Sequence, residues 1–396
     1  MITHQNILKS FLCVVALFSF QTLTGCHTPQ TETYGGGQRK AEAPPAKEVK
    51  QAMAATKSRA DKDMAAVLTE FENLKPTPVI WLSAEEARAQ PTPADAVAAL
   101  LRERKHSTAP LSIGKTKNQT IPGPGGDIPI RIYTPQGNGP FPVIVYFHGG
   151  GWVIATIDTY DSSARALAKD ADAIVVSVEY RKAPEHKFPA AHEDAYAAYQ
   201  WVLHNADTFD GDPSMVAVAG ESAGGNLAAA VCLMARARGE LMPVHQALIY
   251  PVAGYDFNTP SYRENAQAKP LDKPMMGWFF EKYLREPADG NNPLVDLVNA
   301  PNLSGLPPAT IITAEIDPLR WEGKRYAERL LEAGVPVTYR NFEGVTHEFF
   351  GMGAVVGDAK KAVRLVAHGM NGSFDDPVFS RSDRSGRSTQ IEALQD

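Results

Sequence analysis

Short apolar runs of strand length alternate with longer helical stretches over most of the chain after residue 109. Seven runs predict β-strands at Ile128–Tyr133, Val143–Phe147, Ile174–Val178, Val216–Ala219, Gln246–Tyr250, Thr310–Ala314 and Val337–Phe342. The stretches between and after them predict helices at Thr159–Asp170, Ala190–Asn205, Ala223–Ala237, Trp321–Ala333 and Ala359–His368. Strands that read as continuous apolar runs and alternate with helices are typical of a mostly parallel sheet covered on both faces. The pattern therefore predicts an α/β fold.

Two regions do not follow this alternation. Residues 57–107 predict two helical segments, Ala60–Leu74 and Ser83–Glu103, on either side of a proline-rich break. The segment 255–300 is polar, contains a cluster of aromatic residues and separates the fifth predicted strand from the sixth. We expect it to be an insertion on top of the sheet, within a domain that spans residues 108–372.

The first 26 residues predict an export signal. Lys9 precedes the apolar stretch Phe11–Phe20, which is too short to cross a membrane as a mature helix. The ending "LTGC" at Leu23–Cys26 resembles a bacterial lipobox, in which the cysteine becomes the lipidated first residue of the mature protein. We therefore expect an exported, membrane-anchored lipoprotein, with an ordinary signal peptide and a chance cysteine as the alternative. His27 follows the cysteine in place of aspartate, which favours the outer membrane.

The composition is that of a globular protein with polar segments at both ends of its core domain. The net charge of −6, without a sustained basic block, argues against nucleic acid as the main partner. Residues 27–56 predict a flexible tether and residues 373–396 a disordered tail. Because Cys13 belongs to the signal and Cys26 would be acylated, Cys232 remains as a single thiol without an internal disulfide. We expect it to be a small buried apolar residue.

A candidate nucleophile lies in "VAVAGESAGGNLAAA" at 216–230, which reads as strand, sharp turn and helix. Ser222 is the centre of a G-x-S-x-G pattern, and in this context the pattern indicates a nucleophile elbow. Gly220 and Gly224 are small enough for the strained turn to close. A serine hydroxyl needs a base that is itself oriented by a carboxylate.

The base and the acid are expected downstream, since α/β-hydrolases carry them in the order Ser, Asp/Glu, His. Asp317 follows the strand Thr310–Ala314, and His347 follows the strand Val337–Phe342. Both therefore lie at carboxyl ends of strands, where open α/β sheets build their sites. His347 would accept the serine proton and return it to the leaving group, while Asp317 would fix the imidazole tautomer.

Other residues could fill these two roles. Glu315 is the alternative acid, but Asp317 lies farther into the loop and precedes Pro318, which favours a turn. His148 and His186 are alternative bases, and both precede the serine in the chain.

Three consecutive glycines follow the strand Val143–Phe147, in "YFHGGGW". Glycines expose backbone amides, which suits either a phosphate loop or an oxyanion hole. A phosphate loop requires a following Lys-Ser/Thr, which this sequence lacks at that place. We therefore predict an oxyanion hole, to which the amide of Ala223, after the nucleophile, would also contribute.

Together these motifs resemble the bacterial hormone-sensitive-lipase-like esterases over about residues 58–370. The matching pieces are "HGGGW" at 148–152, "YRKAPEHKFPAA" at 180–191, "GESAGGNLA" at 220–228, "DPL" at 317–319 and "THEFF" at 346–350. Ala155, Glu221 and Glu348 depart from the family pattern, which often has glycine, aspartate and glycine there. In and just after the second motif, Arg181, Glu185 and Asp194 are expected to fix loops through hydrogen bonds and ion pairs rather than to bind substrate.

The resemblance implies an α/β-hydrolase fold and a carboxylic-ester hydrolase that uses neither a metal nor an organic cofactor. It implies a triad of Ser222, Asp317 and His347, and an oxyanion hole formed by the amides of Gly150, Gly151 and Ala223. It also implies a cap formed by the N-terminal helices and the 255–300 insertion. The aromatic residues of that insertion, Trp278, Phe279, Phe280 and Tyr283, are expected to line a closed pocket for short to medium acyl chains.

Two alternatives to ester hydrolysis follow from the same residues. An amidase or lactonase would use the same acyl-enzyme chemistry. A non-catalytic binding protein is the other, since plant gibberellin receptors resemble these esterases but lack the catalytic histidine. His347 argues against the second alternative.

Overall fold

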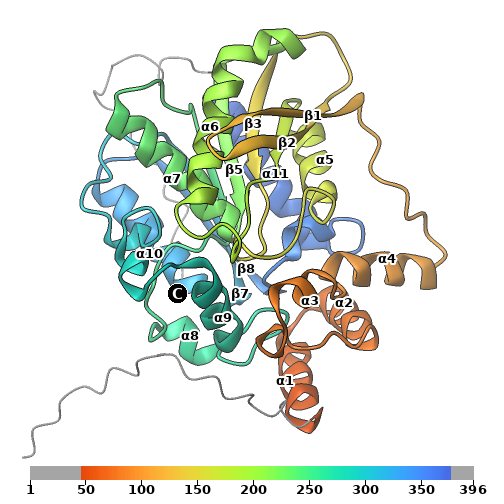
Figure 1. Ribbon diagram of the computed structural model, residues 1–396. Helices are drawn as coiled ribbons and strands as arrows, with labels where there is room; N and C mark the ends of the chain where they lie inside the picture. Colours follow the sequence, from red (N-terminus) through yellow and green to blue (C-terminus); the bar gives the residue numbers. More distant parts are fainter. Residues whose placement is uncertain (1–45, 376–396) are drawn as a thin grey trace, which may run out of the picture. The chain divides into compact units, whose positions relative to one another are not determined.

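In the computed structural model, which describes residues 46–375, eight strands form one sheet in the order β1-β2-β4-β3-β5-β6-β7-β8 (Figure 1). The strands are β1 (Lys115–Gly123), β2 (Gly126–Thr134), β3 (Phe141–Phe147), β4 (Ile174–Val178), β5 (Gly211–Glu221), β6 (Gln246–Ile249), β7 (Ala309–Ile316) and β8 (Val337–Thr346). β2 is antiparallel to both β1 and β4, and all other neighbours are parallel. The predicted α/β-hydrolase fold is confirmed.

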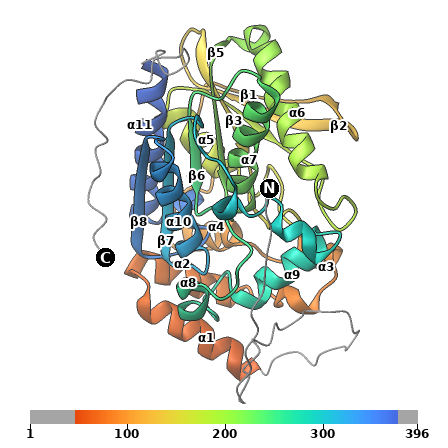
Figure 2. The same cartoon turned by 90° about the vertical axis from the view of Figure 1, so that its left-hand side faces the viewer.

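The central strands are apolar throughout because both faces of the sheet are covered. In β3, Val143, Val145 and Phe147 pack into one hydrophobic cluster, while the alternate residues Ile144 and Tyr146 pack into the other. Helices α6 (Ala190–Asn205), α7 (Ala223–Arg238) and α10 (Arg320–Glu332) contribute to the first cluster. Helices α5 (Asp161–Asp170) and α11 (Gly357–Asp375) contribute to the second, on the opposite face (Figures 1 and 2).

The register of the central strands brings two of the predicted motifs together. β3 runs parallel between β4 and β5, and its last residue, Phe147, pairs with Val178 on one side and Gly220 on the other. The glycine loop that follows β3 and the serine turn that follows β5 therefore begin side by side, at the carboxyl ends of these two central strands.

Helices from two distant parts of the chain gather at one end of the sheet (Figures 1 and 2). The N-terminal group is α1 (Ala46–Arg59), α2 (Lys62–Asn73), α3 (Ala84–Arg88) and α4 (Pro93–Glu103), with the short helix η1 (Val79–Trp81). The insertion contributes α8 (Pro260–Glu264) and α9 (Lys273–Tyr283), followed by the short helices η3 (Pro287–Asn291) and η4 (Leu297–Asn299). We call these two groups the cap.

The local structure differs from expectation in four places. Residues 46–56, predicted as part of a flexible tether, form most of α1 and bury Ala52, Met53 and Thr56. The proline-rich composition ends at Pro45, and the residues after it are good helix formers. The segment 83–103 forms two helices because a second capping box, at Thr92 and Asp95, starts α4.

The third difference is strand β1, which the sequence did not predict because its residues form no apolar run. It is the edge strand of the sheet, and most of its residues are exposed, so it needs no apolar face. At the other end, residues 373–375 belong to α11 rather than to a disordered tail.

The predicted export signal, the tether before residue 46 and the tail after residue 375 lie outside the described residues. Between residues 46 and 375, no helix is long and apolar enough to span a membrane.

Candidate active site

Ser222 occupies a strained turn between β5 and α7. Its backbone has φ 56° and ψ −118°, a conformation that residues with a side chain rarely adopt. The flanking glycines make this turn sterically feasible. A Cβ on Gly220 would lie 2.1 Å from the carbonyl oxygen of Gly224, and a Cβ on Gly224 would lie 2.0 Å from that of Phe147. The predicted nucleophile elbow is therefore present in its expected strand–turn–helix context.

The three predicted triad residues lie in one hydrogen-bonded series. Nε2 of His347 is 3.0 Å from Oγ of Ser222, and Nδ1 of His347 is 2.7 Å from Oδ2 of Asp317. The other carboxylate oxygen of Asp317 accepts a hydrogen bond from the backbone N–H of Leu319 at 2.8 Å. All three side chains are buried, which keeps their relative positions fixed.

The alternative acid and bases lie elsewhere. Glu315 accepts a hydrogen bond from the backbone N–H of Gly344 at 2.8 Å and lies 3.8 Å from Arg59 of the cap. His148 is buried against Tyr180, with 4.4 Å between ring centroids, and its Nδ1 lies 2.7 Å from the carbonyl oxygen of Gly149. His186 is exposed. Their positions favour Asp317 and His347 over all three.

The environment of His347 raises its pKa above the ordinary value for histidine. Burial alone would lower this pKa, but the adjacent charge of Asp317 and its hydrogen bond raise it. The carboxylates of Glu348 and Glu221 act in the same direction. The imidazole is therefore a stronger base than a free histidine.

Glu221 and Glu348 depart from the family pattern in the sequence, and that departure by itself predicts no role for either carboxylate. Glu221 is buried behind the serine, where the hydroxyls of Tyr146 and Tyr250 donate to its two oxygens. Burial, together with the charge of Glu348, raises the pKa of Glu221 to about 7. Glu348 borders the cavity beside His347. Both carboxylates therefore add to the effect of Asp317 in raising the pKa of His347.

The glycine loop after β3 passes under the cap at close range. Gly150 and Gly151 have φ values of 99° and 58°, and both line the same cavity as Ser222. A Cβ on Gly151 would lie 2.2 Å from the ring of Phe279, and one on Gly150 would lie 2.3 Å from the carbonyl oxygen of Ile154. Ala223 is the first residue of α7, so its amide has no partner within the helix. Gly150 and Gly151 thus share a cavity with Ser222, and Ala223 follows the serine directly in the chain.

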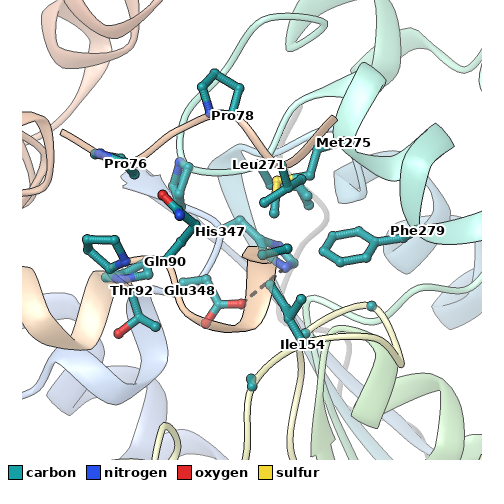
Figure 3. A pocket seen from close by; sticks show the side chains of 18 of the residues that line it. Pro76, Pro78, Gln90, Thr92, Ile154, Leu271, Met275, Phe279, His347 and Glu348 are labelled. Carbon is teal, nitrogen blue, oxygen red and sulfur yellow. Dashed lines mark ion pairs between the residues drawn. The ribbon is translucent and has the colours of Figure 1, made fainter. Parts of the chain in front are cut away.

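A cavity of about 310 Å³ opens onto the triad (Figure 3). Ser222 and His347 line it, and its other walls come from the segment 150–160 after β3 and from both groups of the cap. The apolar side chains around it include Pro76, Pro78, Leu271, Met275 and Phe279. The proline-rich break between the N-terminal helices, which the sequence presented as a connection, is thus a wall of the site.

Of the four aromatic residues expected to line this pocket, only Phe279 is among the lining residues described for it, and Trp278 packs edge-on against Phe279 with 5.4 Å between ring centroids. Tyr283 instead stacks on Trp152, with 4.2 Å between ring centroids, and Phe280 packs edge-on against Tyr255. These two rings support the wall from behind rather than contact the cavity. Consecutive residues of a helix point in different directions, so Phe280 on α9 does not face the cavity that its neighbour Phe279 lines.

The loop that carries Asp317 is tied to both groups of the cap. Asn265, at the end of α8, donates from Nδ2 to the carbonyl oxygen of Asp317 at 3.1 Å. Its Oδ1 accepts from Arg59 of α1 at 2.7 Å, and Arg59 also pairs with Glu264 at 2.9 Å. The N-terminal helix, the insertion and the acid loop therefore form one hydrogen-bonded series.

The polar residues of the "YRKAPEHKFPAA" segment fix loops, as predicted. Arg181 holds Asp194 through its guanidinium, with the shortest contact at 2.8 Å. Glu185 pairs with Arg88 of the cap at 2.6 Å. Cys232 is buried, as expected for a small apolar residue.

Comparisons with known proteins agree with this geometry. Residues 144–351 match the family described as alpha/beta hydrolase fold. The chain is 43% identical to the carboxylic ester hydrolase LipN of Mycobacterium tuberculosis over 260 residues, which cover 63% of this chain and 69% of LipN. It is 46% identical to the carboxylesterase NlhH of the same organism over 242 residues, which cover 60% and 75% of the two chains.

A solved structure resembles this one over most of its own length. The esterase of Pyrobaculum calidifontis superposes with a TM-score of 0.69 at 38% sequence identity, covering 76% of this chain and 97% of that one. The sequence and the fold thus resemble the same group of enzymes.

Proposed function

Because the chain belongs to the alpha/beta hydrolase fold family and is a hormone-sensitive-lipase-like carboxylic-ester hydrolase, we propose that it works through an acyl-enzyme on Ser222. The supporting observation is the series of contacts from Oγ of Ser222 through His347 to Asp317, at 3.0 and 2.7 Å. The resting site therefore already has the contacts that serine activation requires.

Each residue has a defined part in this reaction. Oγ of Ser222 attacks the ester carbonyl while Nε2 of His347 takes its proton, and Asp317 holds the ring in the required tautomer. The amides of Gly150, Gly151 and Ala223 donate to the negatively charged oxygen that forms. His347 returns the proton to the leaving alcohol, and water then releases the acid from the serine.

The assignment of the nucleophile is tested by Ser222→Ala. We expect the folded variant to lose activity by about 10⁶-fold, because the acyl-enzyme cannot form. A serine-reactive organophosphate should label the wild type at Ser222 and leave the variant unlabelled. Unchanged turnover in a folded variant would contradict the assignment.

The cavity supports short to medium acyl chains as substrates. Its volume of about 310 Å³ is at the lower end for small-molecule sites. Each methylene buried in it adds about 0.8 kcal/mol of favourable transfer energy until the cavity is full. We propose an optimum of roughly four to eight acyl carbons on this basis. A panel of esters, amides and lactones would show whether the same acyl-enzyme also accepts other leaving groups.

We also propose that the protein is exported and anchored to the membrane through a lipid on Cys26. The support is the pattern at Leu23–Cys26 after a positive and an apolar segment. His27 favours the outer membrane as the destination. Cys26→Ala should prevent lipidation and move the mature enzyme from the membrane fraction to the soluble fraction. A wild-type protein that is soluble without detergent and has no lipid on its N-terminus would contradict this proposal.

A further inference from the structure

Glu348 places a carboxylate beside the reacting groups at a backbone position suited to glycine. Its φ of 73° and ψ of 4° lie in the left-handed region, where a side chain causes strain. The side chain borders the cavity that contains Ser222, and its Oε1 lies 3.8 Å from Nε2 of His347 (Figure 3). This is the nitrogen that also contacts the serine.

The Glu348 carboxylate is held in a fixed orientation. The hydroxyl of Tyr160, a buried residue at the start of α5, lies 2.7 Å from each of the two carboxylate oxygens. A single O–H group occupies only part of the hydrogen-bonding capacity of a carboxylate, whose two oxygens offer about four acceptor positions. The side chain is 22% exposed, so acceptor positions remain open to the cavity.

The positive side chains around the cavity are paired with other acids. Three of them line it, and each has its own carboxylate partner, in the pairs Lys182–Glu179, Arg88–Glu185 and Lys269–Asp272. None of these three ion pairs involves Glu348. Its carboxylate is therefore available as an acceptor for a small molecule at the reaction centre.

We propose that Glu348 positions the water that hydrolyses the acyl-enzyme. A single oxygen can lie within ordinary hydrogen-bonding distance of two acceptors that are 3.8 Å apart. Water has two O–H groups, so it can donate one to Nε2 of His347 and the other to Glu348. Its lone pair is then free to attack the acyl carbon.

The step is balanced without any further reactant, and it rests on the acyl-enzyme proposed above. A bond forms between the water oxygen and the acyl carbon, and the bond from that carbon to Oγ of Ser222 breaks. One water proton passes to Nε2 of His347 and from there to Oγ, which releases the carboxylic acid and free serine. Glu348 accepts a hydrogen bond throughout and exchanges no proton.

This role affects one half of the reaction more than the other. During acylation the attacking oxygen belongs to Ser222 and is positioned by the chain itself. During deacylation water is free to rotate, and a second acceptor fixes its orientation. An alcohol such as methanol has one O–H group, which His347 alone can accept. Removal of Glu348 should therefore slow attack by water more than attack by methanol.

The test is the partition of the acyl group between water and methanol. A p-nitrophenyl ester is hydrolysed in a fixed concentration of methanol, and the acid and the methyl ester are quantified for wild type, Glu348→Leu and Glu348→Gly. We expect the ratio of methyl ester to acid to rise about tenfold in both variants, which corresponds to the loss of one hydrogen bond to a charged acceptor. The burst of p-nitrophenol that reports acylation should change less than about threefold.

Two controls separate this role from a structural one. Glu343→Leu makes the same change at an exposed position of β8 and should leave the ratio unchanged. Glu348→Gly removes the backbone strain together with the carboxylate, so it should fold at least as well as the wild type. An unchanged ratio in both Glu348 variants would overturn the proposal. Labelling of Ser222 by an organophosphate in the same variants tests the acyl-enzyme separately.

Discussion

Oδ2 of Asp317 lies 2.7 Å from Nδ1 of His347, although thirty residues separate the two in the chain. Asp317 follows β7 and His347 follows β8, and these neighbouring strands run parallel, so their carboxyl ends meet. Glu315 is two residues away but faces Gly344 and the cap. The position of each carboxylate relative to the end of β7 thus determines which one orients the histidine.

Asp317→Asn should lower kcat by about 10⁴-fold, because an amide at this position stabilises the wrong imidazole tautomer. Glu315→Gln should have a far smaller effect, since its contacts lie outside the triad. Steady-state rates of the two purified variants on one p-nitrophenyl ester measure the difference. The reverse ranking would assign the acid to Glu315.

The pH profile should reflect the raised pKa of His347. The histidine acts as a base in its neutral form, so kcat/KM should rise with pH through a midpoint above the ordinary 6.5. The groups that act on His347 are Asp317, Glu348 and Glu221, with the ring of Tyr250 packed against it. Glu348→Gln removes one negative charge and should move the midpoint to lower pH. A midpoint at or below 6.5 in the wild type, or no displacement in the variant, would contradict this reading.

Gly220→Ala should destabilise the serine turn. Its new methyl group would lie 2.1 Å from a carbonyl oxygen of Gly224, so the backbone must move, at a cost of about 1–3 kcal/mol. Gly277→Ala is the matched control, because a methyl group at that position in α9 meets no atom within 4 Å. It should stabilise the protein by about 0.5–1 kcal/mol through helix propensity. Thermal unfolding of both variants checks the opposite signs.

Phe279→Ala should enlarge the pocket and move the preferred acyl chain to greater length. The ring lines the cavity directly over Gly151, so its loss extends the space next to the reaction centre. Rates on p-nitrophenyl esters from two to sixteen carbons measure the change. Trp201→Ala is the control: that ring stacks on Phe209 and neither lines the cavity, so its loss should leave the preference unchanged even if stability falls. A wild-type maximum at sixteen carbons with activation at an oil–water interface would instead indicate a true lipase.

The sequence predicted the buried strands and the triad, because both follow from short segments of the chain and from the order of the strands. Continuous apolar runs identified the buried strands, because strands covered on both faces need no polar residues. The order of Ser222, Asp317 and His347, each after a strand, was enough to group them, since parallel strands end at one edge of the sheet. Both inferences depend on residues close to each other in the chain or on strand order alone.

Features that depend on distant contacts could not be predicted in this way. The orientation of Glu348 follows from a left-handed backbone and from Tyr160, which lies 188 residues earlier. The contribution of Pro76 and Pro78 to the cavity arises from how the cap packs. Helix α1 is hard to predict because a proline- and glycine-rich segment directly precedes it in the chain.

The hydrogen bonds from Arg59 to Asn265 and from Asn265 to Asp317 connect the N-terminal helix to the catalytic site. The family match begins at residue 144, yet a residue of the N-terminal helix steadies the loop that carries the triad acid. A shortened chain that kept every catalytic side chain but lost α1 would lose part of the support for its own acid. The support of the triad acid therefore extends beyond the hydrolase domain into the N-terminal helix.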